Sequence, residues 1–84
     1  MTGFITLGQY VRFHRENKKL TIETLAELCD VSDKCISNIE LDISIPKTDT
    51  FFKICHVMDI DIGDLNVIRF KEEIRSYEAR LSMH

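Results

Sequence analysis

The sequence contains no apolar run near the roughly 20 residues that a membrane span requires. Its N-terminus lacks the basic region and following apolar stretch typical of a signal peptide, so we expect a cytoplasmic protein with no membrane partner. The cysteines are odd in number and form no Cys-x-x-Cys pair, which argues against a disulfide framework and a zinc site. We therefore expect no metal and no cofactor, and buried thiols at Cys29, Cys35 and Cys55.

The sequence is also poor in the patterns that enzymes need. Its three glycines, at positions 3, 8 and 63, do not form a phosphate-binding loop. No paired carboxylates, no nucleophile beside a base and no cluster of metal ligands stand out by their spacing, so we do not expect an enzyme. Tyr77 and Glu78 are more simply explained as packing and solubility residues on a charged C-terminal segment.

An excess of positive charge is missing as well, because the formal net charge is −3. Nucleic-acid-binding proteins are usually basic, so this value counts against such a function. The charge is unevenly distributed. Residues 1–20 carry four basic side chains against one acidic side chain, whereas residues 21–42 carry one lysine against six acidic side chains. A surface that binds DNA would have to draw on the first segment and on scattered lysines.

What the sequence does contain is helical periodicity, which predicts an all-α fold of five helices with short connections. The first three predicted helices cover about residues 7–17, 22–29 and 32–41. Each is preceded or begun by a hydroxyl residue that can cap its first turn, and these residues are Thr6, Thr21 and Ser32.

The single proline, Pro46, predicts a break after the third helix, because proline cannot continue one. Thr48 or Asp49 can start a fourth helix. Asp61 can cap a fifth, with Asp64 in its first turn.

The chain is divided by this pattern into a compact helical domain over residues 1–65 and a helical extension over residues 66–84. The extension carries apolar side chains at alternating intervals of three and four, a pattern of two heptads. Two heptads are too short for a stable coiled coil alone. The stripe either pairs with a second copy, as a dimerisation segment, or packs on its own domain, and its members are Val67, Phe70, Ile74, Tyr77 and Leu81.

The most informative segment is residues 21–40, which holds two short amphipathic helices joined by a tight turn. Ala26 is a small residue one turn before the bend, where the two helices must approach closely. Val31 can fill the apolar junction, and Ser32 then caps the second helix. This arrangement projects the second helix outward, so that it can lie in a major groove while the first crosses the backbone.

In these features the sequence resembles the phage repressor and Cro-like (Xre-type) helix-turn-helix family. The resemblance covers about residues 7–65 and rests on the segments LGQYVRFHREN, LTIETLAELCDVSDKCISNIE and FFKICHVMDIDIGDL, with Pro46 between the last two. It implies a compact, lambda-repressor-like domain of five helices with an extended C-terminal helix. It also implies that Arg15 and Glu40 form a structural ion pair between the first and third helices.

The resemblance further implies a DNA-binding face on the third helix. Asn38 can bond an adenine edge, Lys34 a guanine or a phosphate, and Asp33 only a cytosine or a bridging water. Backbone N–H groups at the starts of the second and third helices can add phosphate contacts. The candidate DNA-binding residues are Thr21, Ser32, Asp33, Lys34, Ser37, Asn38, Ser44 and Lys47.

Three positions depart from the family pattern. Ile22 stands where a polar residue often holds a phosphate, and Asp42 stands where a glycine often follows the third helix. Residues 43–45 are Ile, Ser and Ile where the family often has a basic loop. These changes remove expected phosphate contacts, which supply much of the affinity for DNA.

The family implies a sequence-specific transcriptional regulator, with repression the expected sign, that binds double-stranded DNA as a homodimer. Two alternatives stay open: a protein-interaction module with the same fold, and an antitoxin-like regulator acting through a protein partner. Charge around the third helix discriminates between them. A positive rim favours DNA and a negative or apolar rim favours a protein, and the candidate rim residues are Arg12, Lys18, Lys19, Lys34 and Lys47.

Overall fold

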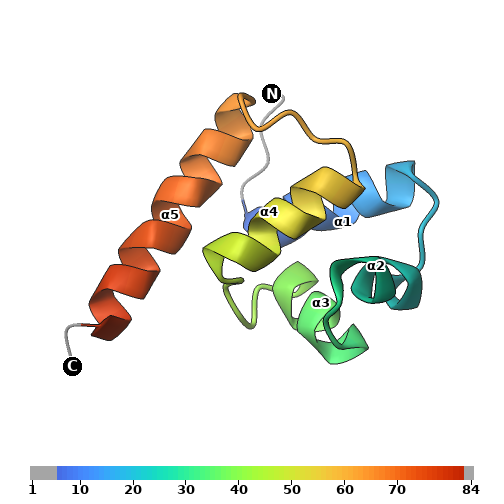
Figure 1. The fold of residues 1–84 in the computed structure, drawn as a ribbon, viewed down its shortest axis with the longest axis horizontal. Helices are drawn as coiled ribbons and strands as arrows, with labels where there is room; N and C mark the ends of the chain where they lie inside the picture. Colours follow the sequence, from blue (N-terminus) through green and yellow to red (C-terminus); the bar gives the residue numbers. More distant parts are fainter. Residues whose placement is uncertain (1–5, 83–84) are drawn as a thin grey trace.

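A computed structural model describes residues 6–82, and within this range every regular element is an α-helix (Figure 1). The all-α fold of five helices expected from the sequence is therefore confirmed. Helices α1 to α4 form a compact body, and α5 runs along one side of it with its C-terminal end projecting beyond the body. The helices are α1 (Leu7–Asn17), α2 (Ile22–Cys29), α3 (Asp33–Glu40), α4 (Thr48–Val57) and α5 (Leu65–Ser82).

The first three helices begin where the capping residues predicted. The side chain of Thr6 accepts a hydrogen bond from the backbone N–H of Gln9, whose own side chain accepts one from the Thr6 backbone. The side chains of Thr21 and Ser32 cap α2 and α3 by accepting from the backbone N–H groups of Thr24 and Cys35, with N···O distances of 3.0 and 3.1 Å. Each cap satisfies an N–H group that the helix itself leaves without a partner.

The first four helices all end without glycine. Each is terminated by a residue with left-handed backbone angles at or just after its last turn, and these are Lys19, Asp30, Asp42 and Asp59, with φ between 53° and 59°. Such a conformation costs an L-residue about 1–2 kcal/mol. Tertiary packing must therefore hold the turns that these residues make.

The core lies between all five helices and is filled by apolar residues, and every charged residue among those described lies at least partly outside it. Tyr10 of α1 packs against Phe70 of α5, with ring centroids 5.3 Å apart. Burial raises the pKa of the Tyr10 phenol to about 12. Cys29 and Cys55 are buried as expected, but Cys35 is only partly buried, so the prediction was wrong for that residue.

Helix α5 packs on its own domain, which was one of the two arrangements left open by its apolar stripe. Val67, Phe70 and Ile74 are all 1% exposed or less and belong to the core cluster. In this conformation these three side chains are unavailable to a second copy. Tyr77 and Leu81 lie farther along the helix and stay accessible, Tyr77 half-buried and Leu81 56% exposed.

The start of α5 corrects the sequence prediction. Asp61 does not cap a helix, because its carboxylate accepts a hydrogen bond from the backbone N–H of Gly63 inside a turn. Asp64 instead lies directly before α5, and its carboxylate accepts from the N–H of Asn66 at 2.8 Å. The local turn at residues 61–63 competes with helix initiation and delays it to Leu65.

Helix α4 begins at Thr48, as predicted, but its first turn is capped from a distance. The carboxylate of Glu78 in α5 accepts hydrogen bonds from the Thr48 backbone N–H at 3.2 Å and from its hydroxyl at 3.0 Å. Lys47, which precedes the helix, makes no side-chain cap. Glu78 therefore has a structural role beyond solubility, since it fastens α5 to the start of α4.

Across residues 6–82, none of the helices combines the length and the apolar character needed to cross a membrane.

Candidate nucleic-acid interface

Helices α2 and α3 meet at a sharp bend made by three consecutive residues. Asp30 adopts left-handed backbone angles, and the N–H of Val31 then donates to the carbonyl of Ala26 at 3.0 Å. Ala26 is 1% exposed, and Val31 packs partly buried against the core. The small residue and the apolar plug thus take the positions that the sequence predicted, and α3 is directed across the end of α2.

The outer face of α3 lies beside the start of α2 and borders an open, shallow hollow. Five of the eight predicted DNA-binding residues line it together, with Arg15, Ile22 and Glu23 as their neighbours. Asp33 and Lys34 are exposed, and Ser37 and Asn38 are half-buried with their side chains at the hollow. The five predicted residues are Thr21, Asp33, Lys34, Ser37 and Asn38.

The other three predicted residues lie elsewhere. Ser32 is exposed at the start of α3, where its hydroxyl is committed to the cap. Ser44 lines a separate hollow between the α3–α4 loop and α5, and Lys47 lines a third one near the C-terminal end of α5. The α3–α4 loop therefore does not extend the hollow beside α3, and its residues line two hollows that border α5 instead.

Behind the hollow, Arg15 of α1 forms the expected ion pair with Glu40 of α3. Two parallel hydrogen bonds join them, from Nε to Oε2 at 2.7 Å and from Nη2 to Oε1 at 3.0 Å. Arg15 also donates to the carbonyl of Leu20 at 2.9 Å. The hydrogen bond to Glu40 raises the pKa of Arg15 above its ordinary value. Because both side chains are largely buried, the pair is a structural clamp on the last turn of α3.

A second clamp joins α1 to the end of α3. Asp42 has a φ of 59°, and its Oδ1 accepts a hydrogen bond of 3.0 Å from the backbone N–H of Gly8. A carboxylate is favourable at the N-terminus of α1, where helix N–H groups are unpaired. Asp42 therefore keeps the left-handed turn usually made by glycine and adds a bond that glycine lacks.

This geometry coincides with a family match. A family model described as "Helix-turn-helix domain" matches residues 8–65, which is more than half of the chain. The protein belongs to the helix-turn-helix family. Its two central helices, α2 and α3, are the pair for which the family is named.

One solved structure gives an independent view of the helix-turn-helix fold. It is the crystal structure of the clp gene regulator ClgR from Corynebacterium glutamicum, which shares 23% sequence identity with this chain. The TM-score is 0.68, and the match covers 92% of this chain and 81% of the ClgR chain. At this identity the similarity shows the fold. Among curated proteins, none matches the chain.

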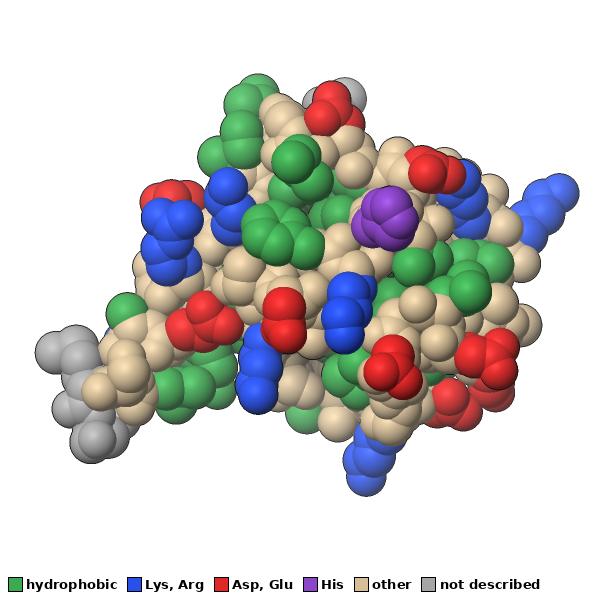
Figure 2. Space-filling model, viewed as in Figure 1, with side chains coloured by type: hydrophobic (Ala, Val, Ile, Leu, Met, Phe, Trp, Pro, Cys, Tyr) green, Lys and Arg blue, Asp and Glu red, His purple; other side chains and the backbone are tan. Residues whose placement is uncertain are grey.

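The surface of the helix-turn-helix unit is acidic, both in the hollow and outside it. Lys34 is the only basic residue between positions 21 and 42, whereas five acidic residues in that range are exposed. Acidic side chains accordingly gather over the α2–α3 side of the molecule, at the lower right of Figure 2. The five are Glu23, Glu27, Asp30, Asp33 and Asp42.

Two members of the candidate positive rim are engaged in ion pairs. Arg12 pairs with Glu16 on α1, with Nε and Oε2 3.2 Å apart. Lys18 pairs with Asp59 at the end of α4, with Nζ and Oδ2 2.7 Å apart, which lowers the pKa of the Asp59 carboxyl. Both pairs reduce the net positive field near α1. Lys34 therefore stands out as the cation on the face of α3.

Proposed function

We propose that this helix-turn-helix protein binds double-stranded DNA in a sequence-specific manner, with α3 in the major groove, and regulates transcription as a repressor. The observation that supports this most directly is the open polar face of α3 beside the start of α2. An outward helix with its neighbour crossing behind it is the docking geometry of helix-turn-helix proteins. The name of the similar structure, a gene regulator, agrees with this role. Repression is inferred from the family resemblance alone.

In the proposed complex the residues of the hollow take different roles. The Asn38 amide can donate to and accept from an adenine edge, and Lys34 can reach a guanine or a phosphate. Thr21 is committed to its cap, with its hydroxyl within 2.9 Å of the Thr24 hydroxyl. Phosphates near α2 would therefore meet the unpaired N–H groups of its first turn. Ile22 contributes apolar contact only, so a helix N-terminus replaces the usual polar side chain.

Operator DNA is commonly read by two copies whose third helices enter successive major grooves about 34 Å apart. We propose that this protein also acts as a homodimer. Bound across an operator, such a dimer would exclude RNA polymerase by occupying its site.

The acidic surface supports a second candidate function, in which the domain acts through a protein partner. Glu23 and Asp33 lie in the same hollow as Lys34 and would repel phosphate. Leu41 is 61% exposed and borders an adjoining hollow with Ser37 and Glu40, where an exposed apolar side chain suits contact with a protein. The two candidates make opposite predictions for salt dependence, because counterion release accompanies binding to phosphates.

The test is selection of bound fragments from genomic DNA, followed by affinity measurements over a range of salt concentrations. We expect Lys34→Ala to weaken binding and to reduce the slope of log K against log salt by about 1. Asn38→Ala should cost about 1–3 kcal/mol on the selected site and little on random DNA. Lys53→Ala removes the same charge from the exposed surface of α4 and is the matched control. An affinity that responds equally to Lys34→Ala and Lys53→Ala would refute a groove-facing α3.

A further inference from the structure

The C-terminal end of α5 carries an uncovered apolar surface. Leu81 is 56% exposed and continues the helix face that buries Ile74 farther back. It borders a mainly apolar hollow with Tyr77 of the same helix and with Ile45 and Pro46 of the α3–α4 loop. A well-formed apolar hollow at the projecting end of a helix favours a macromolecular contact over solvent.

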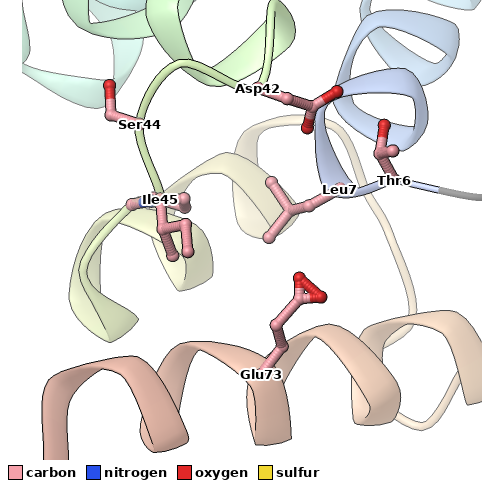
Figure 3. Close-up of a pocket in the computed structure, with 7 residues that line it drawn as sticks. Thr6, Leu7, Asp42, Ser44, Ile45 and Glu73 are labelled. Carbon is pink, nitrogen blue, oxygen red and sulfur yellow. The ribbon is translucent and has the colours of Figure 1, made fainter. Parts of the chain in front are cut away.

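A second hollow adjoins the first and is acidic. It shares Ile45 and Pro46 as lining residues and adds the carboxylates of Asp42 and Glu73. In Figure 3, Glu73 points from α5 across this hollow toward Leu7. The two hollows together follow α5 from Glu73 to its C-terminal end, so an occupant that fills both must present apolar groups and a cation.

The chain itself carries that combination on α5. Glu73, Tyr77 and Arg80 follow one another at intervals of four and three, so they lie on one side of the helix. Leu81 lies next to this line, and the Arg80 guanidinium lies 6.0 Å from the centre of the Tyr77 ring. Along this side of α5 an acidic, an aromatic and a basic side chain follow in order. An antiparallel copy of the helix presents them in the reverse order, so opposite charges meet.

We propose that a second copy of this chain occupies the two hollows, with α5 antiparallel to its counterpart and the two-fold axis at Tyr77. This register places residues 80 and 81 of each copy beside residues 73 and 74 of the other. Arg80 then meets Glu73, and Leu81 lies over Ile45 and Pro46, which line both hollows. Both contacts occur twice because the interface is isologous. A parallel pair would instead place like charges together. The proposal deepens the proposed homodimer, and its test contains no DNA, so each can fail separately.

The test is analytical ultracentrifugation of the full chain over a range of protein concentrations. We expect a wild-type dimer, and we expect Arg80→Glu and Glu73→Arg each to raise the dimer dissociation constant about tenfold. The double variant restores the opposite charges in exchanged positions and should return close to wild type. Leu81→Glu places a charge in the apolar hollow and should weaken the dimer about a hundredfold.

The control is Arg75→Glu, which makes the same charge change on the opposite side of α5, where Arg75 is exposed. Circular dichroism checks that all variants keep their helices, as expected for exposed positions. A wild-type chain that stays monomeric across the series overturns the proposal. A dimer whose dissociation constant is unchanged by both Leu81→Glu and Arg80→Glu also overturns it, since its interface then lies elsewhere.

Discussion

Replacing Gly8 with alanine tests how closely α1 and α3 approach each other. A Cβ atom at this position would lie 2.5 Å from the carbonyl oxygen of Ile39 and 2.6 Å from that of Glu40. It would also lie 2.7 Å from Oδ1 of Asp42, which bonds the Gly8 N–H. The first two atoms belong to the backbone of α3 and cannot rotate away. The helices must therefore separate to make room.

The expected cost follows from these contacts. Forcing an extra carbon into a packed region costs about 1–3 kcal/mol, and stretching the hydrogen bond to Asp42 adds about 1 kcal/mol. The better helix propensity of alanine returns at most about 1 kcal/mol. We therefore expect Gly8→Ala to lower the free energy of unfolding by about 2–3 kcal/mol. In a domain of this size that corresponds to a fall in Tm of about 10–20 °C.

Thermal unfolding followed by circular dichroism measures this shift, and Gly63→Ala is the matched control. A Cβ at Gly63 would lie 3.3 Å from an oxygen of the exposed Asp61 side chain, which can move aside. We expect that variant to stay within about 0.5 kcal/mol of wild type. Equal Tm values for the two variants would refute the close approach of α1 and α3.

Two further predictions concern the α5–α4 contact and the thiols. Glu78→Ala removes the remote cap on α4 and should lower the free energy of unfolding, measured by urea titration, by about 1 kcal/mol. The control, Glu72→Ala on the same helix, should change it little. Equal effects of the two substitutions would show that Glu78 does not cap α4. In the native protein a thiol reagent should label Cys35 rapidly and the buried Cys29 and Cys55 only after unfolding. Burial also raises the pKa of Cys55 from 9.0 to about 11. The unfolded thiol thus ionises first, and stability should fall between these two pH values.

Local chemistry made much of the fold predictable from the sequence. The caps at Thr6, Thr21 and Ser32 lie within three residues of the N–H groups they bond, so the starts of the first three helices could be located. The cap on α4 had no such signal. Its acceptor, Glu78, is 30 residues from Thr48, and only the folded chain brings the two together.

The sequence-based predictions were wrong or undecided where one sequence pattern is compatible with two different structures. Asp61 and Asp64 are both good caps, and the turn that Asp61 makes with Gly63 is a purely local competitor. An apolar stripe at intervals of three and four serves equally for a helix on its own core and for a helix on a partner. Phe70 is buried in the core of its own domain, so this part of the stripe packs on its own core.

The candidate site was partly predictable for the same reasons. The α2–α3 turn determines which side of α3 faces outward, so the grouping of Lys34, Ser37 and Asn38 followed from spacing. The path of the α3–α4 loop depends on tertiary packing, and no local pattern indicated that Ser44 would line a hollow separate from the one beside α3. Asp42 was interpreted only as the loss of a glycine, because the group that its carboxylate bonds, the Gly8 N–H, is 34 residues away in the sequence.

The two clamps between α1 and α3 also bear on how the protein would accommodate an uneven binding surface. Glu40 and Asp42 anchor α3 to separate turns of α1, so a tilt of α3 alone would break one anchor or the other. Adjustment is therefore expected as rigid-body rotation of the whole globule. Such rotation turns on the end of α5, from Glu78 to Ser82. Discrimination between DNA sites of different shape would then depend on the stiffness of the connection between the two domains of a dimer, more than on the flexibility of either domain.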